Sequence, residues 1–253
     1  MIKFFRKIRQ KLLSENKFSK YLIYAIGEIV LVVIGILIAL GINNWNENNK
    51  TQQVTNDYLE RLLTETQINL DKVEKEIEIE QNQINASKKI LDMFHQERKS
   101  LRSKTIDSLI SIVFSANAID INSGIFTEGI NSGKIGNLKS EKLRTALYGF
   151  VGLAEDLKRQ EQIWNNDLND VLGVFLYKNF NYRNMDNSFG KYKDKIGTTH
   201  FKDFNNLSLL NSMEFENHID NRFYTNNGQL EIYQNLSSDL KKIENLIKNE
   251  LKK

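Results

Sequence analysis

Hydrophobic residues are concentrated in one uninterrupted run near the start of the chain. Residues 21–42 read YLIYAIGEIVLVVIGILIALGI, which is 22 residues with a single charge, Glu28. At 1.5 Å per residue a helix of this length spans about 33 Å, close to the ~30 Å of a bilayer's hydrocarbon core. Tyr21, Tyr24 and Trp45 mark the two ends of the run, and aromatic side chains favour the membrane–water interfaces. The pattern predicts a transmembrane helix at 21–42.

After this run, apolar residues recur three or four positions apart with charged residues between them. Neither Pro nor Gly occurs from 43 to 103, so we expect one helix near 50–100. It should continue from the membrane helix, with the Asn-rich stretch 43–49 as the weakest point. Its apolar positions approximate a heptad seam: Val54, Tyr58, Leu62, Leu70, Val73, Ile77, Ile84 and Leu91.

The same spacing predicts more helices towards the C-terminus, and no stretch alternates like a strand. Ser140 is a good N-cap for a long helix, and the polar stretch 181–202 is typical of a loop or lid. The expected helices cover 105–117, 140–180, 204–219 and 230–251. One more short helix is expected among the glycines of 118–139. The fold class is therefore all-α: an N-terminal transmembrane helix, then one domain over 43–253 that forms an antiparallel bundle of long helices.

Charge is distributed unevenly around the apolar run. Residues 1–20 contain seven Lys or Arg and one Glu, which leaves −3 for the rest of a chain of net charge +3. The positive-inside rule then predicts a cytoplasmic N-terminus and an extracytoplasmic, periplasmic domain at the bacterial inner membrane. Residues 1–20 are either a basic amphipathic helix on the inner leaflet or a disordered tail. A cleaved signal peptide ending near Ala39 and the buried core helix of a soluble protein are the alternatives for 21–42.

Glu28 lies about two turns inside the apolar run, where a carboxylate is costly. Helical spacing aligns it with Tyr24, Gly35 and Ala39, and the last two form a small-xxx-small pair that permits close helix approach. We expect this stripe to contact a transmembrane helix of a second copy or of another protein. The alternative is a neutral glutamic acid tolerated near the headgroups. A single helix offers no pathway for a proton relay.

Composition excludes several kinds of chemistry. Without cysteine there can be no disulfide, thiolate nucleophile or zinc–cysteine site. The three histidines, His95, His200 and His218, share no ligand spacing, and no catalytic motif occurs, so we expect no metal, no cofactor and no enzyme activity. The basic charge lies beside the apolar run and not on the folded domain, which indicates a lipid bilayer and not nucleic acid as its partner.

Residues 129–134, GINSGK, resemble a phosphate-binding loop but lack its spacing, because three residues separate the glycines and Ile135 follows the lysine. Termination of a helix explains the glycines better. A turn at Ser132, Gly133 and Lys134 could still present backbone N–H groups to an anion, and these three residues are a weak candidate for an anion-binding turn.

The N-terminal 47 residues, and above all GEIVLVVIGILIAL followed by INNWNE, resemble an uncharacterised family of small single-pass membrane proteins from Gram-negative bacteria of the Bacteroidota type. That family is a domain of unknown function. The resemblance implies an inner-membrane anchor and a periplasmic helical domain, and it supplies no activity or catalytic residue.

Three function classes remain after these observations. The favoured one is a non-enzymatic interaction or scaffold protein of the cell envelope, assembled through its anchor, its coiled segment or both. The alternative is a periplasmic ligand-sensing domain that acts through a membrane partner, since only about 20 residues would lie in the cytoplasm. An enzyme is the least favoured class.

Overall fold

The computed structural model describes residue 7 and residues 18–115, 118–192, 195 and 197–252. Within these residues the regular structure is entirely helical and contains no strand. The chain divides into two compact units, Met1–Asp57 and Tyr58–Lys253. The amphipathic helix expected over residues 1–20 falls almost wholly outside the described residues.

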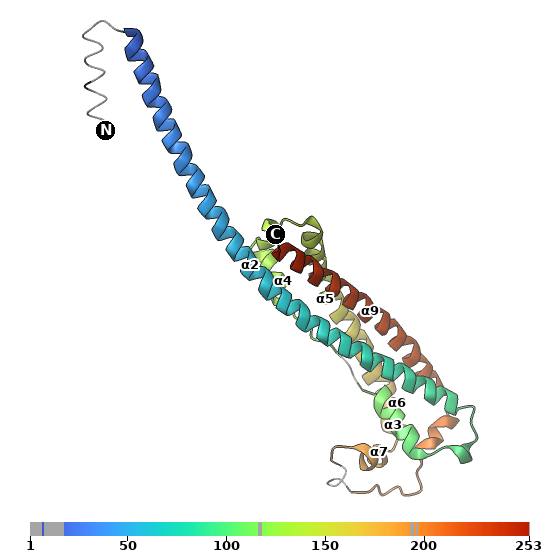
Figure 1. Ribbon diagram of the computed structural model, residues 1–253. Helices are drawn as coiled ribbons and strands as arrows, with labels where there is room; N and C mark the ends of the chain where they lie inside the picture. Colours follow the sequence, from blue (N-terminus) through green and yellow to red (C-terminus); the bar gives the residue numbers. More distant parts are fainter. Residues whose placement is uncertain (1–6, 8–17, 116–117, 193–194, 196, 253) are drawn as a thin grey trace. The chain divides into compact units, whose positions relative to one another are not determined.

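Helix α2, Phe18–Met93, begins in the first unit and continues into the second (Figure 1). Residues 43–49 are helical, so the asparagines do not interrupt it and the expected continuity is confirmed. No described side chain between 22 and 57 is buried, and the large apolar ones of 22–42 are exposed by 46% (Ile34) to 69% (Ile23). By length and composition this segment can cross a membrane. Such exposure does not fit the core helix of a soluble protein.

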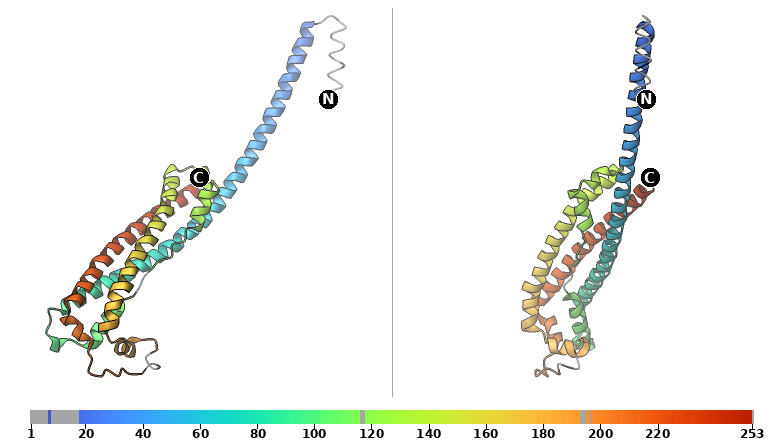
Figure 2. Two further views of the ribbon diagram at one scale, coloured as in Figure 1. Left: turned by 180° about the vertical axis from the view of Figure 1, so that it is seen from behind. Right: turned by 90° about the vertical axis from the view of Figure 1, so that its left-hand side faces the viewer.

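The second unit is built on three helices that lie side by side: residues 58–93 of α2, α5 (Glu141–Asp167) and α9 (Met213–Leu251) (Figures 1 and 2). Helix α9 runs antiparallel to α2. Gln67 of α2 donates to Glu244 of α9 at 2.9 Å. Further along α2, Gln83 accepts from Asn226, in the middle of α9, at 2.7 Å. As residue numbers rise along α2, their partners on α9 fall.

The antiparallel arrangement expected of the bundle holds for α9 against α2, whereas α2 and α5 run parallel. The start of α5 meets the end of α9, where the backbone N–H groups of Lys139 and Ser140 donate to Glu250. Ser115 bonds to Gln83, and residues 118–128 return along α2, where Asn69 bonds to Asn122 and Arg61 to Glu128. This returning segment brings α5 back to the end at which α2 enters the bundle.

Short helices flank this return. The chain forms a 3₁₀ turn, η1 (Arg98–Ser100), and then α3 (Ser103–Val113), α4 (Gly124–Asn131) and a second 3₁₀ turn, η2 (Lys134–Asn137). The helix expected at 105–117 is confirmed as far as Val113, and its last two residues, 116 and 117, lie outside the described residues; the short helix among the glycines of 118–139 is confirmed as α4.

The expected long helix over 140–180 is confirmed with one internal change of pitch. The Ser140 hydroxyl accepts from the Leu143 N–H at 3.2 Å, so Ser140 is the predicted N-cap. Helix α5 passes into a π-helical turn, η3 (Leu168–Gly173), before α6 (Val174–Asn179). A Cβ on Gly173 would lie 3.2 Å from the Leu168 carbonyl oxygen, so the wider turn leaves little room for a side chain there.

Two expectations near the C-terminus were wrong. The supposed loop 181–202 contains helix α7 (Tyr182–Phe189), capped by the Asn181 side chain, which accepts from the Asn184 N–H at 3.3 Å. The helices expected at 204–219 and 230–251 are a 3₁₀ turn, η4 (Asn206–Asn211), and the single helix α9. Gly228 is exposed on α9 with nothing packed against it, so packing of the opposite face keeps the helix unbroken.

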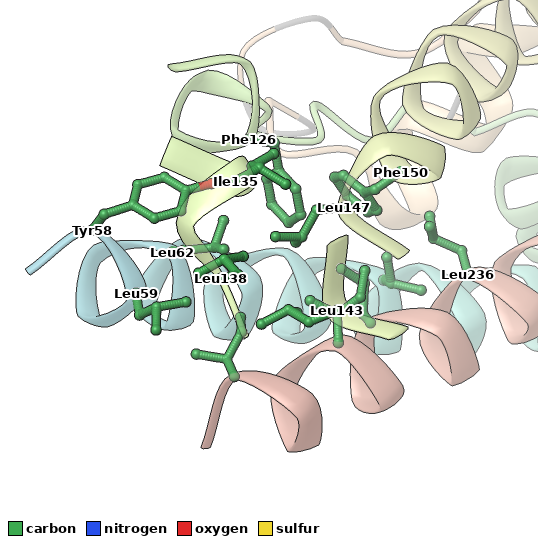
Figure 3. Packing of buried hydrophobic residues seen from close by; sticks show 14 of the residues in the cluster. Tyr58, Leu59, Leu62, Phe126, Ile135, Leu138, Leu143, Leu147, Phe150 and Leu236 are labelled. Carbon is green, nitrogen blue, oxygen red and sulfur yellow. The ribbon is translucent and has the colours of Figure 1, made fainter. Parts of the chain in front are cut away.

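The interior of the bundle holds two apolar clusters. The first joins α2, α4, α5 and α9, and Figure 3 shows Phe126 and Phe150 turned toward each other within it; their rings stack at 4.0 Å. The second joins α2, α3, α6, η4 and the start of α9, with Ile90, Ile106 and Phe215 fully buried. Outside both clusters, Ile163 of α5 is 56% exposed.

Buried positions on α2 and α9 keep a regular alternation of three and four residues, the spacing of a heptad. On α2 these positions are Leu59, Leu62, Thr66, Asn69, Val73, Glu76, Glu80, Gln83, Ser87 and Ile90. On α9 they are Phe215, Ile219, Arg222, Asn226, Gln229, Tyr233, Leu236, Leu240, Ile243, Ile247 and Glu250. A seam with this spacing therefore faces the chain's own helices, but it shares only Leu62 and Val73 with the expected one and contains many polar residues that an apolar pattern could not detect. Of the other expected positions, Tyr58 and Ile84 are buried, Leu70, Ile77 and Leu91 are half-buried, and Val54 is exposed.

Candidate functional site

Polar side chains replace apolar ones in the middle of the bundle, between the two apolar clusters. We call this set the polar layer. Its members come from all three helices and are buried to at least 92%: Glu76, Glu80 and Gln83 from α2, Glu161 from α5, and Arg222, Asn226, Gln229 and Tyr233 from α9. Burying groups of this kind is costly unless they bond to one another, so their partners decide what the layer can do.

Gln83 is the centre of the hydrogen bonding between α2 and α9. Its Nε2 donates to the backbone oxygen of Ser115 at 2.9 Å and to the Ser115 hydroxyl at 2.8 Å. Its Oε1 accepts from Asn226 at 2.7 Å and, at a longer 3.4 Å, from Arg222. This one amide ties α2 to α9 and to Ser115.

Gln229 and Glu80 form a second link between the same helices. With the Gln229 amide turned so that its nitrogen faces Glu80, that nitrogen lies 2.9 and 3.1 Å from the two carboxylate oxygens. The negative charges of Glu80 and Asp167 favour the charged form of Arg222, although burial is the larger effect and lowers the pKa of its guanidinium.

Glu161 brings α5 into the layer. Its carboxylate accepts from the Tyr233 hydroxyl at 2.6 Å and from the Ile119 N–H at 3.1 Å. Burial raises the pKa of Glu161, with both hydrogen bonds opposing that shift, and burial together with the Glu161 carboxylate raises the pKa of Tyr233. Tyr233 therefore stays a protonated donor, unsuited to act as a base or nucleophile near neutral pH.

Glu76 is the least satisfied member of the layer. It is 8% exposed, and its Oε1 is buried with no hydrogen-bond partner in the described part of the chain. Burial raises the pKa of Glu76, and the negative charge of Glu161 raises it further. Three carboxyl groups thus share the layer with one guanidinium, and the pKa values of two of them, Glu76 and Glu161, are raised.

An open groove of about 630 Å³ lies beside the layer, with Glu161 and Leu157 on one wall and Ile119 on the other. That volume is within the ~300–1,000 Å³ common for small-molecule sites. Asp120, Lys158 and Gln162 also line it. Among the described residues no group of three or more His, Asp or Glu could hold a metal ion.

The residues expected to contact another membrane helix all lie on α2 in the first unit. Tyr24, Gly35 and Ala39 are exposed and Glu28 is half-buried. A methyl group added to Gly35 would meet no atom within 4 Å, so another helix could approach it closely. Contact of this stripe with a partner stays a prediction.

The expected anion-binding turn already faces a carboxylate of the chain itself. Gly133 adopts a left-handed conformation (φ 71°) after α4 ends. Lys134 Nζ lies 2.6 Å from Glu128 Oε1, and Arg61 makes a bidentate contact with the same carboxylate at 2.6 and 3.0 Å. Hydrogen bonds from Arg61 and then Lys134 lower the pKa of Glu128 to about 2. A free anion at Ser132–Lys134 would have to compete with Glu128.

Sequence reasoning missed the polar layer because charged residues between apolar ones normally form a solvated face. The available signal was spacing alone. The alternation of three and four residues that starts at Leu59 and Leu62 continues through Glu76, Glu80 and Gln83 to Ile90. Only the structure shows that α9 meets this seam with polar residues of its own.

Comparison with known proteins gives one match. The model of a family of unknown function, DUF6090, matches residues 28–227, which include most of the polar layer and the segment that returns along α2. Neither the curated proteins nor the solved structures contain a match.

Proposed function

This chain belongs to DUF6090, a family of unknown function, and we propose that it is a membrane-anchored, non-enzymatic interaction protein of the bacterial cell envelope. Its N-terminus would lie in the cytoplasm, one helix would cross the inner membrane, and the bundle would lie in the periplasm. The basic residues before the apolar run support this orientation, since Lys and Arg favour the cytoplasmic side.

The observation that carries the proposal is the exposure of the apolar half of α2. Every large aliphatic side chain from Leu22 to Ile42 is about half exposed. Fully burying one such side chain contributes roughly 1.5–3 kcal/mol. A helix that leaves so many of them uncovered requires an apolar environment, and a bilayer provides one over the length of this run.

Assembly through this anchor is supported by the packing of the bundle, whose seams are covered by the chain's own helices. The buried faces of α2 and α9 pack against each other and against α5, so they are not available to a second chain. The exposed stripe with Tyr24, Glu28, Gly35 and Ala39 remains as the contact surface. Its partner would be a second copy or another transmembrane helix, with Gly35 and Ala39 permitting close approach.

Cysteine crosslinking tests this interface directly, because the chain has no cysteine of its own. Gly35→Cys and Ala39→Cys lie on the stripe, and Val33→Cys is a matched control about 200° round the helix from position 35. With a thiol-coupled benzophenone photocrosslinker, which inserts into C–H bonds of any neighbouring chain, the first two variants should form an adduct in membrane vesicles, either a dimer or a complex with one partner, and Val33→Cys should not. Equal crosslinking at all three positions, or none on the stripe, would rule out this interface.

Orientation needs a separate measurement. A membrane-impermeant maleimide added to intact spheroplasts should label Asn48→Cys and leave Ser14→Cys unlabelled until the membrane is opened. The reverse pattern would contradict the proposed topology. Release of the chain by carbonate, with a mature N-terminus near residue 42, would show a cleaved signal peptide in place of an anchor.

A second candidate function, sensing a small molecule, is favoured by the groove beside Glu161. A ligand there could exchange hydrogen bonds with Glu161 and so reach Tyr233 and α9. A thermal-shift screen of the full chain in detergent tests this function. A compound that stabilises the native chain but not Glu161→Gln, with exposed Glu141→Gln as the control, would support it. Equal stabilisation of all three proteins would count against it.

A further inference from the structure

A second hollow in the bundle unit has lining residues of a different kind. It lies where α6 passes into α7 and faces the segment 199–204 (α6 and α7 are labelled in Figure 1). Its volume is about 510 Å³. Five aromatic residues line it, and we call it the aromatic cleft: Tyr177, Phe180, Tyr182, Phe201 and Phe204.

The aromatic wall on α6 and α7 is ordered by contacts between its own rings. The Tyr182 ring lies 5.3 Å from Tyr177 and 5.0 Å from Phe180, edge-on to the latter. Phe180 is 7% exposed and anchors the group, whereas Tyr177 is 79% exposed and offers its ring to solvent. A large aromatic surface left uncovered beside a hollow is suited to stacking against a ring.

The facing segment is tied to α7 by hydrogen bonds, so the two walls are fixed with respect to each other. Asn181 donates to the Thr199 hydroxyl at 3.1 Å, and Asn184 donates to the Phe204 carbonyl at 3.2 Å. Asn206 accepts from the Asn181 N–H at 2.8 Å. A binding surface held in this way loses little entropy when it takes up a ligand.

The charged side chains that line the cleft, Lys178 and Arg183, are both cations. His200 lines it as well, and no Asp or Glu does. None of the three forms an ion pair within the described residues. Asp186 acts on the Tyr182 hydroxyl and Asp203 belongs to the facing segment, but neither carboxylate lines the cleft. Free cations beside stacked rings complement a molecule that carries both a ring and a negative charge.

One donor in this wall lacks a partner. The Tyr182 hydroxyl is buried and makes no hydrogen bond in the described part of the chain. Burial, Tyr177 and Asp186 together raise the pKa of Tyr182 to about 12, so the hydroxyl keeps its proton at neutral pH. A buried hydroxyl without a partner is costly, and an acceptor group on a ligand would relieve that cost.

We propose that the aromatic cleft binds a small organic anion that carries a ring. The ring stacks on Tyr177 while its carboxylate or phosphate binds Arg183 and Lys178. An acidic sugar and an aromatic acid both carry a ring and a negative charge, and the experiment distinguishes these two kinds of ligand. The proposal does not depend on whether α2 crosses a membrane.

Isothermal titration of the full chain tests the proposal. An uncharged polyoxyethylene detergent keeps sugar and ionic headgroups from competing. The probes are glucuronate and 4-hydroxybenzoate, each with its neutral counterpart, glucose and 4-hydroxybenzyl alcohol. We expect saturable binding of at least one anion and binding at least about tenfold weaker for its neutral counterpart, the effect of losing one charge-assisted contact. Binding by glucuronate alone would identify a sugar site, and binding by 4-hydroxybenzoate alone an aromatic-acid site.

Variants locate the binding in the cleft. Tyr177→Ala and Arg183→Gln should each weaken binding about tenfold. Exposed residues outside the cleft provide the controls, Tyr224→Ala for the ring and Arg159→Gln for the charge, and these should bind like the native chain. Circular dichroism checks that each variant folds, and Lys178→Gln replaces Arg183→Gln should that variant unfold. Absence of saturable binding by either anion, equal binding of the neutral probes, or equal losses in the controls would overturn the proposal.

Discussion

In residues 22–42 of α2 the isoleucines, leucines and valines are exposed, whereas in residues 58–93 of the same helix Thr66, Asn69 and Gln83 are fully buried. The usual relation between side-chain polarity and burial is thus inverted in the first half, and in the second half these polar residues share the buried face with leucines and isoleucines. Lipid would explain the first half, because it makes exposed apolar groups favourable. Hydrogen bonds explain the second, because Thr66 donates to the Leu62 carbonyl, Asn69 pairs with Asn122, and Gln83 accepts from Asn226.

A helical seam has two separate properties, the spacing of its side chains and their chemistry. A spacing of three and four residues determines which side chains face a neighbouring helix, and it holds along α2 from Leu59 to Ile90. The chemistry of those side chains determines which neighbouring helix can pack against the seam, and in which register. Buried polar contacts such as Gln83 with Asn226 match in only one register, whereas leucines tolerate several.

Charges placed in the first half of α2 should have the largest effect. Leu31→Arg combined with Ile34→Arg puts two cations near the centre of the apolar run, at about 2.5–3.5 kcal/mol each on insertion scales. Most of the protein should then be lost from the carbonate-resistant membrane fraction. Leu31→Ala with Ile34→Ala is the control and should stay in that fraction. Membrane association unchanged by the two arginines would contradict a lipid environment.

Removing the one cation of the polar layer should be the next largest change. Arg222→Met leaves the Glu80 charge without its compensating neighbour, which costs about 3–5 kcal/mol in buried pairs. Urea unfolding of the bundle in detergent, followed by circular dichroism, measures the loss. Adding Glu80→Gln to Arg222→Met should restore a large part of it. A double variant no more stable than Arg222→Met would show that the two charges are not coupled.

Truncation of a leucine in the first apolar cluster should produce the loss of stability that is usual for a buried core residue. Leu62 is fully buried, so Leu62→Ala should lower the free energy of unfolding by about 2–5 kcal/mol. Leu31→Ala, in the exposed half of the same helix, should leave unfolding of the bundle unchanged. Equal losses for the two substitutions would remove the distinction between the halves.

The smallest effect on stability should come from substituting Glu76, and this effect depends on pH. Since burial raises the pKa of Glu76 above the ordinary 4.5, the folded chain holds a proton that the unfolded chain has released. The native bundle should therefore lose stability as pH rises from 4.5 through the raised pKa, and level off above it. Glu76→Gln should be more stable than the native chain by about 1 kcal/mol at pH 8.

That advantage of Glu76→Gln should shrink towards pH 5, as the native carboxyl group takes up its proton. Urea midpoints of both proteins at the two pH values measure it. The lowered pKa values of Glu128 and Glu244 act in both proteins alike and cancel from the difference. A native chain that is the more stable of the two at pH 8 would show that the Glu76 carboxylate is stabilised in its charged form.

Local sequence signals predicted much of the fold. The apolar run, the absence of proline and the Ser140 cap are properties of neighbouring residues, and helices α2 and α5 follow them. The parallel direction of α2 and α5 does not follow from these signals, because it depends on Asn69 and Arg61 holding residues 118–128 against α2. Such contacts between residues far apart in sequence leave no periodic trace.

The same limit applies to the candidate sites. Spacing placed Tyr24, Glu28, Gly35 and Ala39 on one face because a single helix determines it. The polar layer needs three helices in register, and the aromatic cleft needs α6 and α7 opposite Thr199–Phe204. The mostly polar composition of 182–189 favours a loop, although Tyr182, Met185 and Phe189 recur at i, i+3 and i+7, which is the signal of a short amphipathic helix.

Accessibility of spin labels along α2 tests most directly whether its halves occupy different environments. Single cysteines, which the chain otherwise lacks, would be labelled at successive positions from 22 to 42 and from 58 to 93 in proteoliposomes. We predict high collision with oxygen and little with a water-soluble nickel complex across the first stretch. The second should alternate, with protected labels at the buried positions and nickel-accessible labels between them. Nickel accessibility throughout 22–42 would contradict the account.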